Sequence, residues 1–359
     1  MLNIFKQTKP WMVASLLAAT SAFAQQQSTP DKSCRTPKAA EPMQAPATAA
    51  YNAPSRIDVH GSWDIYLQGS FIYWLPEQDN MEYALSSSST GIVNGATNSV
   101  STLKPDFKPG FQIQGGMTFE YDNWDSYVQY TWFHNTNSSN ASAPLNGNLY
   151  PSRGFPSDTN NASAYSKAHE SWNLKMDLAD WVLSRPYYMS PKMTCRPMWG
   201  IRGAWIRQDL DTTYTSNTNV EVYAEKITSW GVGPEVGLTG NYTFGYGLRV
   251  FGDASADVLF TRYNTSANET NTTDSSKYSV SEDSLNTIRP HAMLDLGFAW
   301  SSYFDNNNWH VDLMASYGFQ VFWNQNMFRN AVNSTGTHQT LPNGDLTIQG
   351  LNLSARFDF

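Results

Sequence analysis

The chain has 359 residues, of which 15% are charged and 14% aromatic, and its formal net charge is −8. This acidic balance excludes the basic footprint of a nucleic-acid-binding protein, and the charged share is well below the roughly 25% of a typical soluble domain. A mean hydropathy of −0.47 still permits a membrane protein, because only alternate residues of a transmembrane barrel strand face lipid.

The N-terminus has the pattern of an export signal. Lys6 and Lys9 precede a short apolar run over residues 11–20, and Ala22-Phe23-Ala24 forms an A-x-A cleavage site. The apolar run is too short to span a bilayer as a helix. We therefore predict a signal peptide over residues 1–24, cleaved between Ala24 and Gln25.

The next segment, residues 25–60, is rich in Ala, Pro and Gln and is predicted to be a flexible periplasmic leader. It contains Cys34, while Cys195 lies in the predicted barrel over residues 61–359. Two cysteines in an exported chain permit one disulfide. A Cys34–Cys195 bond, a bond to another chain and two free thiols all remain open.

From residue 63 onward, apolar and polar residues alternate at period two, which places one kind on each face of a sheet. The pattern predicts an all-β, transmembrane, antiparallel up-and-down barrel of at least ten strands (10–16). The segments that carry this pattern lie within residues 63–73, 111–119, 124–132, 172–178, 199–208, 230–239, 248–260, 294–300, 309–321 and 351–359.

The connections between these segments alternate in length. Short connections fall at 122–123, 190–192, 241–246 and 303–308, and long polar ones at 76–109, 134–168, 211–222, 264–285 and 325–346. This alternation predicts short periplasmic turns and long extracellular loops. The longest loops leave room for a further hairpin, for example around residues 81–85.

The final strand runs over residues 351–359 and ends in phenylalanine. We expect it to pair with the segment that begins at Trp63 and so to close the barrel. Phe359 is then predicted to lie at the periplasmic rim as an outer-membrane insertion signal, and Arg356 to face the lumen.

Several short motifs recur in this chain in an order shared with a known family. They lie at residues 71–75, 81–84, 107–111, 124–127, 130–133, 196–197, 200–205 and 230–234, together with Phe359. These stretches resemble the major outer membrane protein-like porins of chlamydia-related and legionella-type bacteria, and the resemblance spans roughly residues 63–359. It implies a pore-forming protein of the bacterial outer membrane that is also a surface antigen. Cysteine-rich branches of that family are cross-linked through disulfides, whereas this chain has two cysteines.

In a pore, function resides in the charged residues that line the lumen, because they set ion preference. Arg196, Arg202 and Arg249 fall on neighbouring predicted strands and are expected to form a basic wall opposite an acidic one. The alternative is that these residues form interior salt bridges that fill a narrow barrel. The complete set of pore-lining candidates is Lys175, Asp177, Arg196, Arg202, Arg249, Asp253, Asp257, Asp295, Asp312 and Arg356.

No enzymatic motif is present: the sequence has neither H-E-x-x-H nor G-x-S-x-G spacing. We therefore expect no catalysis, metal or cofactor, although a hydrolase built from His134, His169, His291 or His310 is conceivable. The sequence favours a passive porin for ions and small hydrophilic solutes. The alternative is an adhesin or ligand-binding barrel with little conduction. Expected partners are outer-membrane lipid, the barrel assembly machinery and, through oligomerisation, further copies of the chain.

Overall fold

A computed structural model describes residues 57, 59, 64–89, 97–119, 123–154, 165–217, 219–271, 277–328 and 344–359. The predicted signal peptide, with its cleavage site at Ala24 and Gln25, and Cys34 lie outside the described residues. So does the leader over residues 25–60, apart from residues 57 and 59. These features stay predictions.

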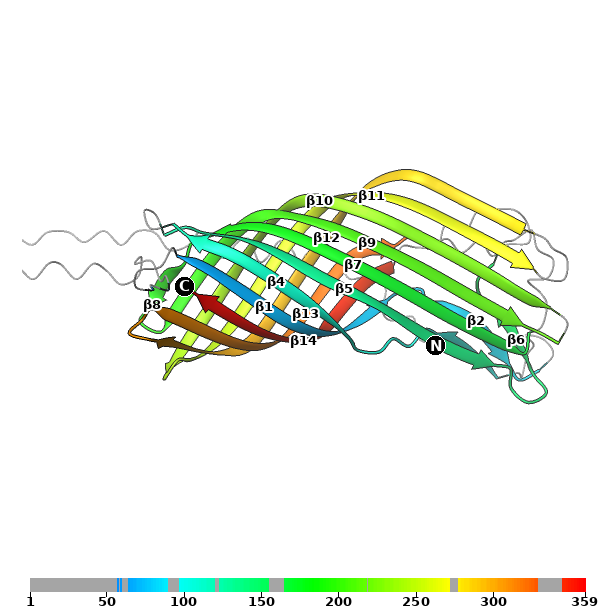
Figure 1. Ribbon diagram of the computed structural model, residues 1–359. Helices are drawn as coiled ribbons and strands as arrows, with labels where there is room; N and C mark the ends of the chain where they lie inside the picture. The colour runs from blue at the N-terminus through cyan, green and yellow to red at the C-terminus, as the bar shows by residue number, and fades with distance from the viewer. Residues whose placement is uncertain are drawn as a thin grey trace, which may run out of the picture. The chain divides into compact units, whose positions relative to one another are not determined.

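Ten antiparallel strands close into a barrel (Figure 1), as the period-two pattern predicted. The last strand pairs with the first from Tyr66↔Asp358 to Gln78↔Leu346, which confirms that residues 351–359 close the barrel. The ten strands are β1 (Ile65–Gln78), β4 (Lys108–Thr118), β5 (Asp125–Ser142), β7 (Lys167–Ser184), β9 (Met193–Thr215), β10 (Val220–Gly245), β11 (Leu248–Asn271), β12 (Lys277–Phe304), β13 (Trp309–Asn326) and β14 (Gly344–Asp358).

Four short strands lie outside this ring. β8 (Tyr187–Ser190) pairs with the start of β9. A separate three-stranded sheet has the order β3-β2-β6, built from β2 (Glu82–Ser87), β3 (Asn98–Thr102) and β6 (Asn148–Pro151). The predicted extra strand around residues 81–85 is therefore β2, but it pairs with β3 and β6 and adds no strand to the barrel.

The barrel strands extend much further than the sequence predicted. Segments 134–168, 211–222 and 264–285 were expected to be loops, yet β5 continues to Ser142, β9 to Thr215 and β11 to Asn271. The prediction was wrong because these segments carry polar residues on their outward face, as loops do. Backbone ladder bonds do not depend on apolar side chains, and the Thr, Tyr and Val residues here favour strands.

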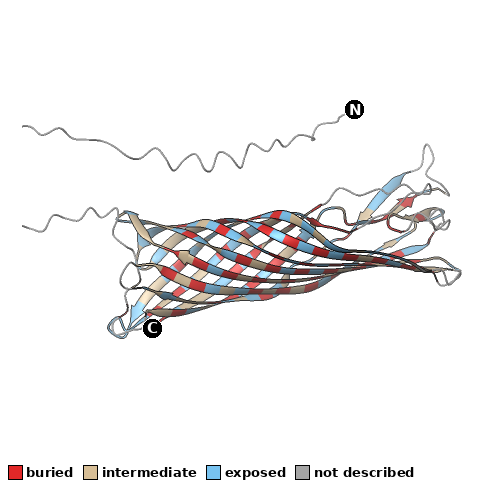
Figure 2. Cartoon of the chain, turned by 90° about the horizontal axis from the view of Figure 1, so that it is seen from above, coloured by how far each residue is buried: buried red, intermediate tan, exposed pale blue. Residues whose placement is uncertain are grey.

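The outward face of the barrel carries an apolar band with a sharp outer boundary. On β9 the outward residues from Met193 to Trp205 are mostly apolar, and Arg207 follows; on β10 they are mostly apolar from Phe244 to Trp230, and Thr228 follows. Figure 2 shows the alternation of buried and exposed residues along the strands. We call the part of the strands beyond Trp205 and Trp230 the outer extension. No helix among the described residues is long and apolar enough to cross a membrane.

The end of the barrel opposite the outer extension has tight turns. Asn123 lies between β4 and β5 with a φ of 55°, and Asp305, Asn306 and Asn307 join β12 to β13 with φ of 51°, 54° and 70°. Asn and Asp tolerate this left-handed region better than other non-glycine residues. The short connection predicted at 303–308 therefore forms the compact end of its hairpin, and so does Asn123 of the connection predicted at 122–123, whose Asp122 lies outside the described residues.

Candidate functional site

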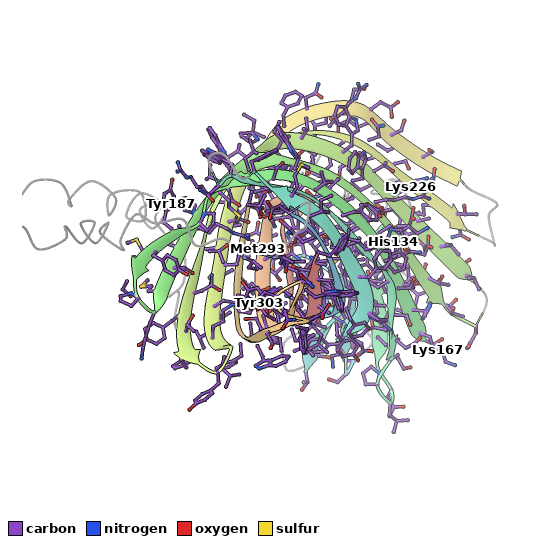
Figure 3. All side chains as sticks on the ribbon, turned by 60° about the vertical axis from the view of Figure 1, so that its left-hand side comes forward. His134, Lys167, Tyr187, Lys226, Met293 and Tyr303 are labelled. Atoms are coloured by element: carbon purple, nitrogen blue, oxygen red, sulfur yellow. The ribbon has the colours of Figure 1, made fainter. Side chains whose placement is uncertain are left out.

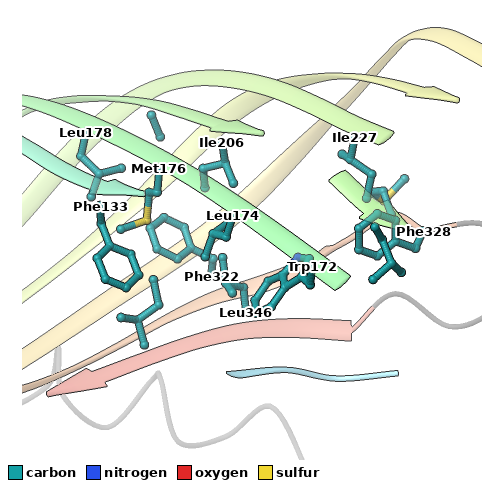
Figure 4. Packing of buried hydrophobic residues seen from close by; sticks show 14 of the residues in the cluster. Phe133, Trp172, Leu174, Met176, Leu178, Ile206, Ile227, Phe322, Phe328 and Leu346 are labelled. Atoms are coloured by element: carbon teal, nitrogen blue, oxygen red, sulfur yellow. The ribbon is translucent and has the colours of Figure 1, made fainter. Parts of the chain in front are cut away.

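An apolar cluster fills the lumen where the barrel passes into the outer extension, and we call it the apolar plug (Figure 4). The ring of Trp74 lies 5.4 Å from that of Phe133 on a strand two positions away in the barrel. Its indole N–H donates to the side-chain oxygen of Asn352 at 2.7 Å. Barrel-strand residues of the plug are Ile72, Trp74, Phe133, Trp172, Leu174, Met176, Leu178, Ala204, Ile206, Leu210, Ile227, Leu259, Tyr263, Phe322, Leu346 and Ile348.

The plug corrects the orientation predicted for β7. Trp172 and Met176 were expected to face lipid but are fully buried inside the barrel, and the alternation places Lys175 and Asp177 on the outward face. Both are therefore wrong as pore-lining candidates. A period-two pattern separates two faces of a strand but does not say which one points inward.

A charge cluster centred on Arg202 lies on the other side of the plug from the outer extension, where the outward face is apolar. The guanidinium of Arg202, only 4% exposed, donates to Asp180 at 2.6 Å, to Glu235 at 2.7 Å and to Asp257 at 2.7 Å. His291 Nδ1 lies 2.6 Å from the same Asp257 carboxylate. Arg202 and Asp257 thus face the lumen as predicted, but they bind each other directly. Asp180 was missed; its signal was that it shares the phase of the inward apolar residues on β7.

The remaining acidic candidates also face the interior and are mostly held by neighbours. Asp312 forms an ion pair with Arg249, whose Nε donates to the Asn241 side-chain oxygen at 3.1 Å. Asp295 accepts a hydrogen bond from the Asn352 amide at 2.8 Å. Asp253 accepts a long one from Thr239 at 3.4 Å.

The two remaining arginine candidates lie against aromatic rings. The guanidinium of Arg356 lies 3.5 Å from the centroid of Tyr66 and donates to Asp358 at 2.6 Å. Arg196 lies 5.9 Å from the centroid of Tyr127. The predicted basic wall opposite an acidic wall is therefore wrong. The arginines are interleaved with carboxylates and rings, which agrees with the alternative of interior salt bridges.

A polar cavity of about 430 Å³ lies in the half of the lumen nearest the tight turns. Trp74 and Ile348 of the plug form part of its wall. Its polar lining includes Gln114, Asp125, Arg196, Asp253, Asp312 and Arg356. We call this space the vestibule.

A second buried ionic group lies in the outer extension, beyond the apolar band. Arg153 follows β6 and is only 1% exposed; it donates to Glu225 at 3.0 Å and to the Asn80 carbonyl at 2.8 Å, and its Nε lies 3.3 Å from Glu170. We call this group the Arg153 latch. Burial raises the pKa of Glu170 to about 7, against the lowering by Arg153, and nearby Glu225 also raises it. The latch ties the β6 segment to β7 and β10.

The four histidines that the structure describes are dispersed, and each has a partner. His310 Nδ1 lies 2.8 Å from Asp358, His134 Nε2 lies 3.0 Å from Asp177, and His169 Nδ1 lies 2.8 Å from Asn140. Among the described residues, no group of three His, Cys, Asp or Glu side chains is placed to hold a metal.

The structure describes one of the two cysteines, Cys195, and the C-terminal Phe359. Cys195 lies on the outward side of β9, half-buried. Cys34, the other cysteine, is outside the described residues, so the three alternatives stay open. Phe359 donates its backbone N–H to Ile65 at 3.1 Å and exposes its side chain. It lies at the tight-turn end of the barrel.

A family model described as "Legionella pneumophila major outer membrane protein precursor" matches residues 58–359, which includes every barrel strand. The chain belongs to the Legionella major outer membrane protein family. No curated protein matches it.

Solved outer-membrane barrels are similar to this family member over most of its length. The outer membrane protease OmpT of Escherichia coli has 10% identity and a TM-score of 0.38, covering 82% of this chain and 96% of its own. A major outer membrane protein from Thermus thermophilus has 12% identity and a TM-score of 0.28, with 81% and 99% covered. The toluene transporter TodX of Pseudomonas putida has 10% identity and a TM-score of 0.27, with 86% and 96% covered.

As a member of this outer-membrane family, the protein has an orientation that its turns indicate. Outer-membrane barrels place short turns in the periplasm and longer structures outside the cell. The vestibule therefore opens on the periplasmic side and the outer extension projects from the cell. At about 3.3 Å per residue and a tilt of about 40°, the ten residues from Trp205 to Thr215 project roughly 25 Å beyond the band.

Proposed function

We propose that this protein is a surface-display barrel of the outer membrane, whose lumen is sealed and whose outer extension is its working surface. The apolar plug carries the proposal. Its side chains come from both sides of the ring, and Trp172, Leu174 and Met176 of one strand face Phe322 and Leu346 of others.

Two physical arguments support a sealed lumen. Hydrophobic constrictions exclude water and so block ions, and a barrel of about eight strands is only wide enough for side chains to fill it. Ten strands add little width, and bulky residues such as Trp74 and Trp172 occupy it here. The Arg202 cluster adds a second barrier, because its ion pairs are buried on all sides.

The outer extension supplies an ordered surface for display. Its strands continue as paired ladders to Thr215↔Val220 and Glu221↔Asn271. The Arg153 latch fixes the β6 segment to these strands, and Tyr214 on β9 donates to the Tyr83 carbonyl of β2 at 2.6 Å. Such a surface suits the binding of an external ligand better than the passage of solutes.

A second candidate is the passive diffusion of ions and small hydrophilic solutes. The vestibule favours it, because about 430 Å³ of polar space reaches half of the lumen from the periplasmic side. Displacement of the plug would join this space to the exterior. We also propose that the protein is not an enzyme, since the four described histidines lie at separate places and each is held by a carboxylate or an amide.

Conductance of the purified protein in planar bilayers separates the two candidates. We expect no stable current steps for the wild type. Replacing Trp172 and Met176 with Ala removes two plug side chains and is expected to produce steps. Trp181→Ala is the matched control, because Trp181 lies on the same strand but faces outward, with 48% exposure.

Regular open steps of the wild type at low voltage would contradict the display proposal and support the porin. The folding of the Trp172→Ala/Met176→Ala variant is verified by heat-dependent gel mobility. If this folded variant gives no current steps, the plug is not the barrier to ions.

A further inference from the structure

Three nitrogen-bearing side chains form a row across the outward face of the barrel. His134 on β5 is directly opposite Lys175 on β7, and Lys175 is directly opposite Arg207 on β9. Thr228 on β10 continues the row beside Arg207. Like charges directly opposite each other on a sheet are destabilising, so the Lys175–Arg207 pair has a structural cost in the absence of an anion.

The row lies just outside the apolar band. In the adjacent row towards the periplasm, Trp132, Asp177, Trp205 and Trp230 are neighbours across the same four strands. Tryptophans of barrel girdles lie at the boundary between hydrocarbon and head groups. Lys175 and Arg207 are therefore at the level of the head groups of the outer leaflet.

An open pocket of about 470 Å³ lies at this place, with His134, Lys175, Asp177, Arg207 and the two tryptophans Trp205 and Trp230 in its lining. Figure 3 marks His134 on this part of the barrel, away from Tyr187 and Tyr303 near the opposite end. Trp205 and Trp230 thus give the pocket an aromatic floor, and Lys175 and Arg207 give it a cationic outer edge.

The local carboxylates do not neutralise the edge. Asp177 accepts from Tyr130 at 2.6 Å and lies 3.0 Å from His134. Arg207 donates to Asp209 at 3.1 Å, but its side chain remains 45% exposed. Among the described residues Lys175 has no hydrogen-bond or ion-pair partner. Within the described part of the chain Lys175 is therefore unpaired, and Arg207 keeps almost half of its side chain exposed beside its ion pair with Asp209. Both cations are accessible to an anion.

We propose that this pocket binds the phosphorylated head group of a lipid in the outer leaflet. Arg207 and Lys175 would hold the phosphate, the first through its planar fork and the second as a point charge. Trp205 and Trp230 would pack against the apolar part of the same lipid. The phosphate chemistry is shared with free phosphate, but the tryptophan floor and the position beside the band favour a membrane lipid.

Native mass spectrometry of the purified full-length barrel tests this proposal with three probes. These are bisphosphorylated lipid A, the same lipid without its phosphates, and inorganic phosphate. We expect a stable adduct with the bisphosphorylated lipid, and binding at least about tenfold weaker for the dephosphorylated lipid, because charge-assisted bonds contribute that much or more. Millimolar inorganic phosphate is expected not to displace the lipid.

The test variant is Lys175→Gln with Arg207→Gln, expected to weaken binding of the bisphosphorylated lipid at least about tenfold. The control, Lys167→Gln with Lys192→Gln, removes the same charge from exposed positions outside the pocket and is expected to bind like the wild type. Equal binding by test and control variants would overturn the proposal. So would equal binding of both lipids, or displacement by phosphate, which would indicate a site for the free anion.

Discussion

Removing the guanidinium of Arg202 is expected to destabilise the barrel strongly, because this side chain forms three buried ion pairs. Arg202→Met keeps most of the side-chain volume but leaves Asp180, Glu235 and Asp257 without their cation. In the wild type, each of these carboxylates lies 2.6–2.7 Å from a nitrogen of Arg202, and each is at most 3% exposed. Water cannot replace the lost partner at such burial.

The expected loss in the free energy of unfolding follows from the burial of these three carboxylates. Breaking a buried ion pair by removing one partner typically destabilises a protein by about 3–5 kcal/mol. Three carboxylates lose their cation at once, so the upper part of that range is expected. An exposed ion pair contributes only about 0–1 kcal/mol.

Urea unfolding in detergent or lipid vesicles, followed by tryptophan fluorescence, measures this free energy of unfolding. The control is Arg262→Met on β11, which is exposed and donates to the Ser284 hydroxyl; we expect a loss below about 1 kcal/mol. Adding Asp180→Asn to Arg202→Met should restore at least about 1 kcal/mol by removing one unpaired charge. If Arg202→Met and Arg262→Met unfold at the same urea concentration, the reasoning is refuted.

Two further predictions concern the outer extension and the β10 backbone. Because the pKa of Glu170 is raised to about 7, the folded latch favours the protonated acid, so its stability is greatest below about pH 4.5 and falls as the pH rises through about 7. The protection factors of the β6 amides, which correct for the intrinsic pH dependence of exchange, should accordingly be higher at pH 5.5 than at pH 8, and Glu170→Gln should remove this difference; a difference that persists in the variant would assign it to another group. Gly233→Ala should destabilise the barrel by about 1–3 kcal/mol, since its Cβ would lie 1.9 Å from the Val258 carbonyl oxygen, whereas Gly240→Ala meets nothing within 4 Å and should be tolerated. Equal urea midpoints for the two alanine variants would contradict this.

The sequence predicted the barrel well because its signals are local. Alternation at period two marked the ten strands, and Asn123 and the Asp305–Asn308 segment marked tight turns. The pairing of the last strand with the first followed from closure, since a barrel leaves no edge unpaired. The β2 strand around residues 81–85 was also indicated, although its pairing with β3 and β6 was not.

The interior was harder to predict, because a residue's partners lie on other strands. The sequence placed Arg202 and Asp257 on inward faces but could not tell a wall from an ion pair, since the ring brings β9 and β11 residues within 2.7 Å. It also missed the latch, because Arg153 lies in an irregular segment and meets Glu225 from a distant strand.

The sequence by itself thus determined where the ten barrel strands lie, their order and the family, though not how far the strands extend, because alternation and turn chemistry are properties of neighbouring residues. Only the tertiary structure decided which face of β7 points inward. Both faces of that strand carry apolar residues, and the ring assigns Trp172 to the lumen and Trp181 to the outside. This assignment closes the lumen with a plug and places Lys175 on the lipid-facing surface, because closure of the barrel alone defines an inside.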